Sequence, residues 1–193
     1  MTARPAWLSF GSSVQPSDSL LVEFHQPLHF VLLDGESGLP AVRVLPDPDG
    51  GERPDELSAE ELAYIEKLRR LVADKQASGK FERPADYQPP PVGTMPSGRV
   101  CDLCQLAHYT PWYAEFHRPL KFTILDCDAC EVPIAVLAEH RVELTPAEVS
   151  FMEQALNLVA EQKYTGRFPK WTFDHTMRQI PDHYHFHVRP LLW

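Results

Sequence analysis

The chain has 193 residues, a formal charge of −9 and 44% hydrophobic residues. This composition can supply a buried core, which excludes wholesale disorder, and the acidic balance argues against binding to DNA or anionic lipid. No apolar stretch reaches the length of a membrane span, and residues 1–10 lack the features of a signal peptide. We therefore expect a cytoplasmic protein of one large domain or two small packed units, with no nucleic-acid or membrane partner.

Two parts of the chain resemble each other. The segment EFHQPLHFVLLD at 23–34 aligns with EFHRPLKFTILD at 115–126. Downstream, LSAEE at 57–61 aligns with LTPAE at 144–148. Because both blocks recur in the same order, they indicate an internal duplication more than two unrelated units.

Each copy predicts a hairpin of two strands. The first copy has short apolar runs at 28–33 and 41–45, and the second copy has such runs at 120–125 and 134–137. In each copy a turn separates the two runs, which is typical of antiparallel strands.

A capping box marks the start of a helix after each hairpin. Ser58 with Glu61, and Thr145 with Glu148, have the required spacing, and Pro146 occupies the first helical position. An apolar stripe at helical spacing follows each box, and we expect both stripes to lie in the core. The stripes consist of Leu62, Ile65, Leu68 and Val72, and of Val149, Met152, Leu156 and Val159.

The chain divides into an N-terminal half at 1–82, a linker at 83–99 and a C-terminal half at 100–193. Prolines crowd the segment 82–98, which predicts a stiff connection, and 47–56 is an acidic loop rich in proline and glycine. The N-terminal half has neither cysteines nor a histidine cluster at its end, so we expect any chemistry in the C-terminal half.

Histidines occupy alternate positions in the segment 182–189. His183, His185 and His187 alternate with aromatic or apolar residues, which predicts a strand with all three imidazoles on one face. In a strand the outer two would lie about 13 Å apart, too far for all three to bind one zinc ion. The three histidines should therefore have different roles.

This pattern resembles the signature of the histidine triad (HIT) superfamily, and the resemblance covers about 100–193. Other landmarks in the family's order are Cys101 with Cys104, Asp126, His140 and Gln179. The resemblance implies an α+β fold with a HIT-like antiparallel sheet and a helix. Combined with the repeat, it implies a pseudo-dimer in one chain, in which a degenerate first half replaces the second subunit of ordinary HIT homodimers, so that the protein can be a monomer.

The resemblance also implies a hydrolase or nucleotidyltransferase whose substrate is a nucleotide or a nucleotide sugar. His185 would attack the α-phosphorus and form a nucleotidyl-histidine, as a neutral imidazole is a good nucleophile. His187 would contact phosphate oxygens or the leaving group. Gln179 would donate to the phosphate, and Asp126 would accept from ribose hydroxyls.

The loop before the triad departs from the family because Arg178 stands where glycine usually precedes Gln179. Without a glycine-bearing loop, the phosphate site is either rebuilt around Arg178 or Arg189 or lost. Two alternatives to catalysis stay open, namely a non-catalytic nucleotide- or sugar-phosphate-binding protein and a zinc-stabilised interaction scaffold.

Zinc-containing relatives further imply one structural zinc ion per chain. Its ligands would be Cys101, Cys104, His140 and His183. An all-thiolate site that joins the first cysteine pair to Cys127 and Cys130 is the alternative. We prefer the mixed site because Cys127 and Cys130 lie at the turn of the predicted hairpin and His140 at its opposite end. Cys127 and Cys130 would then be a redox pair, a second site or simply turn residues.

Overall fold

The computed structural model describes residues 5–15, 18–35, 38–47, 56–94 and 98–191. These residues form a mixed α+β fold of nine strands, two helices and one short 3-10 turn, η1. The strands are β1 (Leu8–Phe10), β2 (Leu20–Phe24), β3 (Phe30–Leu33), β4 (Ala41–Val44), β5 (Trp112–Phe116), β6 (Phe122–Asp126), β7 (Pro133–Leu137), β8 (Lys170–Asp174) and β9 (His185–Leu191). The helices are α1 (Ala59–Ala77) and α2 (Pro146–Tyr164), and η1 spans Asp102–Cys104.

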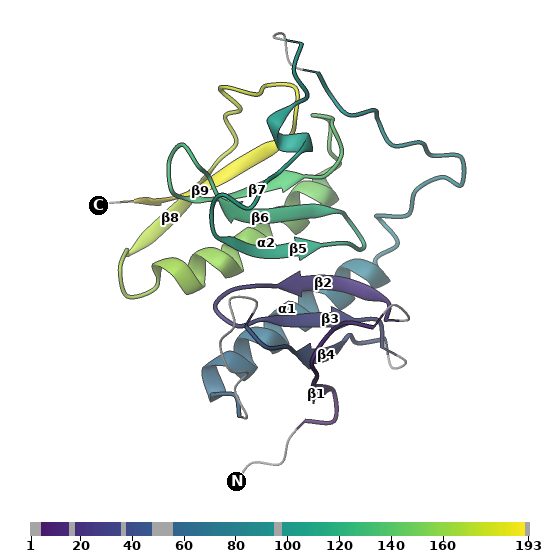
Figure 1. Ribbon diagram of the computed structural model, residues 1–193, viewed down its shortest axis with the longest axis vertical. Helices are drawn as coiled ribbons and strands as arrows, with labels where there is room; N and C mark the ends of the chain where they lie inside the picture. Colours follow the sequence, from purple (N-terminus) through teal and green to yellow (C-terminus); the bar gives the residue numbers. More distant parts are fainter. Residues whose placement is uncertain (1–4, 16–17, 36–37, 48–55, 95–97, 192–193) are drawn as a thin grey trace.

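All nine strands belong to one open sheet, in the order β1-β4-β3-β2-β5-β6-β7-β9-β8 (Figure 1). Neighbouring strands are antiparallel except β1 and β4, which run parallel. The two predicted hairpins are confirmed as β3–β4 and β6–β7.

Both helices begin where the capping boxes predicted. The Ser58 hydroxyl accepts from the Glu61 N–H at 3.2 Å, and the Ser58 N–H donates to the Glu61 carboxylate at 2.7 Å. Thr145 and Glu148 make the same two bonds, and Pro146 is the first residue of α2. These bonds satisfy N–H groups that the first turn of a helix leaves without partners.

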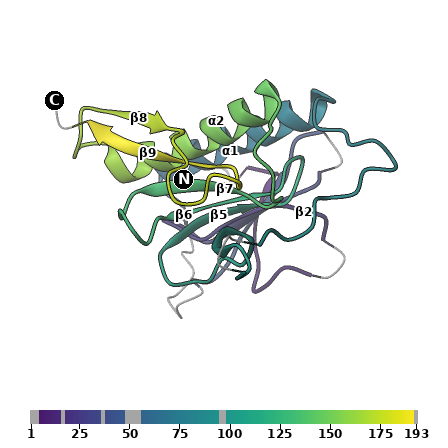
Figure 2. The same cartoon turned by 90° about the horizontal axis from the view of Figure 1, so that it is seen from above.

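The two helices lie on the same face of the sheet and cover one shared core (Figure 2). Six members of the predicted stripes are buried there, and Leu62 and Val149 pack against them half-buried. Within the described residues, no helix is long and apolar enough to cross a bilayer.

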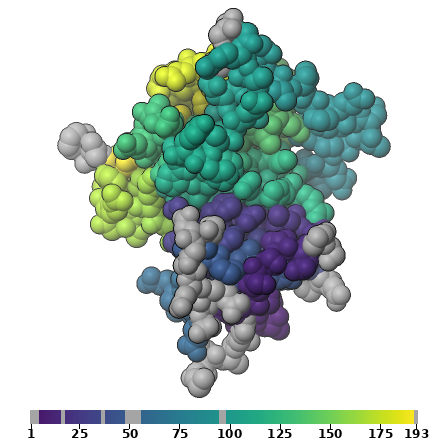
Figure 3. Space-filling view, in the orientation of Figure 1, coloured from purple at the N-terminus to yellow at the C-terminus, as the bar shows by residue number. Residues whose placement is uncertain are grey.

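The halves meet where β2 pairs with β5 at the centre of the sheet. Figure 3 shows them as adjoining bodies, with the purple and blue first half below the green and yellow second half. Lys67 of α1 also lies 3.2 Å from Glu161 of α2, so the helices meet as well.

Residues 83–94 of the linker run beside the second half without a helix or strand of their own (Figure 1). Arg83 donates to Glu148 at 2.9 Å, the Tyr87 hydroxyl donates to Glu139 at 2.7 Å, and the Gly93 carbonyl accepts from the backbone of residue 101. Most of the acidic loop at 47–56, and Pro96 in the linker, lie outside the described residues.

The strand that carries the histidines begins later than predicted. It starts at His185 and continues to Leu191, whereas the sequence pattern places its start at Asp182. The backbone of Tyr184 bonds to the carbonyl of residue 141 and to the N–H of residue 137. His183 is therefore held beside the end of β7, just before β9.

Candidate metal centre and cavity

The two sides of β9 face different surroundings. Tyr184, Phe186 and Val188 point into the core beneath the helices. His185 and His187 line a cavity on the opposite face of the sheet. The predicted alternation thus places two of the three imidazoles at a cavity, while His183 belongs to a separate cluster.

The cavity has a volume of about 730 Å³ and is lined by the η1 segment, the β6–β7 turn, the loop before β9, and β9 itself. It brings together every residue predicted to act on or bind the substrate. These are Asp126, Arg178, Gln179, His185 and His187. Arg189, the other candidate phosphate contact, lines it too.

One ring nitrogen of His185 has a fixed role. Its Nδ1 lies 2.8 Å from the backbone carbonyl of His183. A carbonyl oxygen can only accept, so Nδ1 carries the proton and Nε2 of the neutral ring keeps its lone pair. His185 is 7% exposed and lines the cavity, and because Nδ1 is engaged, Nε2 is the nitrogen left for a bound molecule.

The ring of His187 is buried without a hydrogen-bond partner for either nitrogen among the described residues. Burial, and next the charge of Arg189, lower its pKa from 6.5 to about 4. The imidazole is therefore neutral at pH 7 and can bind a metal ion or accept a proton.

The carboxylate of Asp126 is already engaged by protein groups. Lys163 lies 2.6 and 2.7 Å from its two oxygens, and the Tyr113 hydroxyl donates to it at 3.0 Å. Burial, followed by the Asp126 charge, raises the pKa of Tyr113. A ribose hydroxyl that approaches Asp126 would therefore meet a carboxylate whose charge is balanced by Lys163 and whose oxygens already accept hydrogen bonds.

Two arginines at the cavity share one carboxylate. Arg189 and Arg178 donate to Asp174 at 2.9 and 3.1 Å. Hydrogen bonds from Thr176, and then from the two arginines, lower the pKa of Asp174. One acid against two guanidinium groups leaves positive charge on this side of the cavity, next to exposed Gln179.

The four residues predicted to bind zinc come together beside the cavity. The ligand atoms of Cys101, Cys104, His140 and His183 all lie within 4.8 Å of one another. Cys101 precedes η1 and Cys104 is its last residue, whereas His140 follows β7 and His183 precedes β9. The donors therefore come from three segments far apart in the chain.

The separations in this cluster match the edges of a zinc tetrahedron. Nδ1 of His140 lies 3.3 Å from Nδ1 of His183, and three of the four sulfur–nitrogen distances are 3.2, 3.5 and 3.5 Å. Ordinary zinc bonds to nitrogen and sulfur give tetrahedral edges of about 3.3 Å between nitrogens and about 3.6 Å between nitrogen and sulfur. The cluster can hold a metal ion with little movement.

In both histidines, a protein acceptor lies near Nε2, the nitrogen that faces away from the cluster, and this directs Nδ1 toward the thiols. Nε2–H of His183 donates to the Leu137 carbonyl at 2.6 Å, which leaves its Nδ1 unprotonated toward the thiols. Nε2 of His140 lies 3.5 Å from a carboxylate oxygen of Asp182. Burial lowers the pKa of His183 and raises that of Cys101, so without an ion both groups are neutral.

Gly93 makes room for the His140 ring. A Cβ atom at this position would lie 1.9 to 2.2 Å from three atoms of that ring. The linker backbone therefore packs directly on a candidate ligand, a role that no sequence pattern around Gly93 signals.

The remaining cysteines lie in a different cluster. Ligand atoms of Cys127, Cys130 and His187 lie within 4.8 Å of one another, so these three residues can also hold a metal ion. The structure thus does not support an all-thiolate site made from both cysteine pairs. The sequence pattern missed this grouping because it depends on the pairing of β7 with β6 and with β9.

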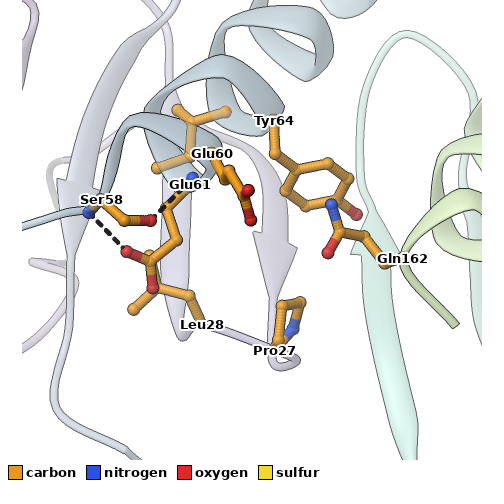
Figure 4. A pocket seen from close by; sticks show the side chains of 8 residues that line it. Pro27, Leu28, Ser58, Glu60, Glu61, Tyr64 and Gln162 are labelled. Atoms are coloured by element: carbon orange, nitrogen blue, oxygen red, sulfur yellow. Dashed lines mark hydrogen bonds between the residues drawn. The ribbon is translucent and has the colours of Figure 1, made fainter. Parts of the chain in front are cut away.

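The first half contains a third cluster and a smaller cavity. Glu23, His25 and His29 lie within 4.8 Å, but His25 pairs with Glu115 at 3.1 Å and His29 with Glu23 at 3.0 Å. A cavity of about 400 Å³ lies at the start of α1, where Figure 4 shows the capping bonds of Ser58 in its wall. Its lining includes no cysteine or histidine, so the second half carries the richer chemistry.

Comparisons of the chain with protein-family models, with curated proteins and with solved structures found no match.

Proposed function

We propose that the chain is an internally duplicated HIT-like nucleotide hydrolase or nucleotidyltransferase that acts at an α-phosphate through His185. One observation carries the proposal. His185 lines the cavity with Nδ1–H bound to a carbonyl, so the neutral ring carries its free lone pair on Nε2, and Arg178 and Arg189 line the same cavity. A neutral nitrogen held in this tautomer is the form of histidine that attacks phosphorus.

In the proposed reaction Nε2 of His185 bonds to the α-phosphorus while the bond from phosphorus to the leaving group breaks. The leaving group takes the electron pair and is then protonated. Water, or another acceptor hydroxyl, next attacks phosphorus, breaks the phosphorus–nitrogen bond and gives up its proton. Arg178, Arg189 and Gln179 line the cavity where they can stabilise charge on the phosphate oxygens.

The symmetry of the central pairing supports a duplicated, pseudo-dimeric fold. Position 23 aligns with 115 in the repeat, and Glu23 pairs directly with Glu115. Val22 aligns with Ala114 but pairs with Phe116, and Phe24, which aligns with Phe116, pairs with Ala114. This exchange is expected when equivalent strands of two subunits meet about a two-fold axis. β2 and β5 also carry a register shift at aligned positions, between Leu20 and Val22 and between Trp112 and Ala114. Sedimentation equilibrium should therefore give the mass of a single chain, and a dimer would contradict this part of the proposal.

We further propose zinc as the ion in the cluster of Cys101, Cys104, His140 and His183. Two thiolates and two imidazoles suit zinc, and four protein ligands make a closed site with a structural role. Zinc analysis should find an ion at this cluster, and a chelator should lower the melting temperature. A Cys104→Ser variant should melt at the temperature of the chelator-treated native protein even when no chelator is added.

The test of the catalytic proposal is a screen of nucleotides labelled at the α-phosphate, followed by acid treatment. The native protein should form an acid-labile adduct, and His185→Ala should form none. His175→Ala is a matched control, because His175 lies outside the cavity lining and pairs with Glu153. Binding without an adduct in the native protein would favour a non-catalytic binding protein. Indifference to every nucleotide would favour a zinc-stabilised scaffold.

A further inference from the structure

The buried ring of His187 needs a partner that protein groups do not provide. It is 8% exposed, and within the described residues neither nitrogen makes a hydrogen bond. A buried polar group left in this state is costly, so such groups usually mark an ordered water, an ion or a functional contact.

The groups that face this ring are two thiols. The β6–β7 turn carries Cys127 and Cys130, and the pairing of Ile134 with His187 brings that turn beside β9. Within the turn, the N–H groups of Cys130 and Glu131 donate to the carbonyl of Cys127 at 3.4 and 2.8 Å. Glu131 adopts a left-handed conformation with φ of 56°, which closes the turn. In this arrangement each sulfur lies within 4.8 Å of a nitrogen of the unpartnered ring.

We propose that Cys127, Cys130 and His187 form a second zinc site whose fourth position opens to the cavity. Two thiolates and one imidazole are soft to borderline donors that select zinc over magnesium or calcium. All three residues line the cavity, and three protein ligands leave a coordination position for a water or a substrate oxygen. The site thus differs from the closed four-ligand cluster nearby.

Charges of both signs surround the open position, since Asp102, Asp126 and Asp128 line the cavity together with Arg178 and Arg189, and the arginines are the groups that would hold an anion there. Two thiolates balance the charge of the zinc ion, and binding releases the two thiol protons. Arg189 lies 3.9 Å from the Cys130 sulfur and, with Arg178, adds positive charge at the cavity wall. The ligand class expected there is a phosphate monoester or the phosphate of a nucleotide. This choice of ligand rests on the proposed function, whereas metal binding does not.

Metal counting tests the site directly. The reduced native protein, dialysed against zinc, should retain two equivalents, and Cys127→Ser/Cys130→Ser should retain one. His187→Asn should weaken binding of the second equivalent at least ten-fold in a chelator competition while its circular dichroism stays native. One equivalent in the native protein, or equal counts in native and double variant, would overturn the proposal. A Cys127–Cys130 disulfide that persists in the presence of reductant and zinc would overturn it as well.

Cobalt substitution tests the open position. Addition of inorganic phosphate should shift the visible bands of the native cobalt protein and leave those of Cys127→Ser/Cys130→Ser unchanged. No shift in the native protein, or the same shift in both, would show that the second ion offers no position to phosphate. His185→Ala should keep both ions and the phosphate shift while it loses the nucleotide adduct, so failure of the catalytic proposal is distinguishable from failure of this one.

Discussion

Gly93 illustrates how a residue without a functional group controls a candidate ligand. Its backbone lies against the His140 ring, and its carbonyl accepts from the N–H of Cys101 at 2.9 Å. The residue therefore touches two members of the four-residue cluster. A side chain at this position would displace the imidazole from the thiols, because the ring occupies the space of the missing Cβ.

We expect Gly93→Ala to weaken zinc binding at this cluster roughly ten- to hundred-fold, the range seen when residues that orient metal ligands are changed. Competition with a chromophoric chelator would measure the affinity. Val92→Ala is the matched control, because Val92 is the preceding residue and is 60% exposed. Unchanged affinity in Gly93→Ala would contradict the role assigned to this glycine.

At the scale of residues, the sequence predicts donors better than their surroundings. Cys101 and Cys104 are recognisable by their spacing, and the structure brings them together with the two predicted histidine donors, His140 and His183. Other contacts depend on where α2 and the linker lie relative to the sheet. Examples are the bond from Lys163 to Asp126 and the packing of Gly93 on His140. Contacts of this kind are long-range, so no local pattern encodes them.

Glu148 joins three elements at the start of α2. Its side chain is 3% exposed and accepts from Arg141 of the preceding loop at 2.6 Å and from Arg83 of the linker at 2.9 Å. It also accepts from the Thr145 N–H in the capping box. Burial opposes ionisation, but the bonds from Arg141 and Thr145 outweigh it and lower the pKa of Glu148 below 4.5.

A lowered carboxyl pKa implies stability that is present above about pH 4.5 and is lost as pH falls through the folded-state pKa. Glu148→Gln should therefore lower the free energy of unfolding by about 1–3 kcal/mol at pH 7, since it removes the more buried of the two carboxylates that Arg83 and Arg141 share, the other being Glu139. Urea unfolding at pH 7 and pH 3 would measure the effect, which should shrink at pH 3. Exposed Glu143→Gln should change little at either pH, and an equal loss at both pH values for Glu148→Gln would contradict the explanation.

At the scale of elements, local signals locate the helices and the hairpins but not the whole sheet. Capping boxes mark the starts of α1 and α2 because they are short-range hydrogen-bond patterns. β2 and β5 are absent from the predicted strands, although β5 alternates between buried and half-buried residues. β1 and β8 are edge strands, and the position of β1 depends on a parallel partner more than 30 residues away.

At the scale of the molecule, the described residues form one sheet and one principal core that spans both halves. The β2–β5 pairing links the halves, and the main cluster of buried side chains includes Phe24 of the first half and Phe116 of the second, with ring centroids 5.8 Å apart. Neither half can therefore unfold without exposing apolar surface of the other.

We expect one cooperative unfolding transition for the zinc-loaded chain. Tryptophan fluorescence reports on both halves, because Trp7 lies in the first and Trp112 and Trp171 in the second. Its urea titration should coincide with that of far-ultraviolet circular dichroism. Two separated steps would show that the halves are independent units.

His183 has two tasks at once, since its ring lies in the four-residue cluster while its carbonyl holds the ring of His185. In the proposed mechanism, zinc bound by the His183 ring would therefore affect turnover through the His183 carbonyl, which orients the nucleophile. Loss of the ion would remove one restraint on His183 and thereby loosen the position of the His185 ring.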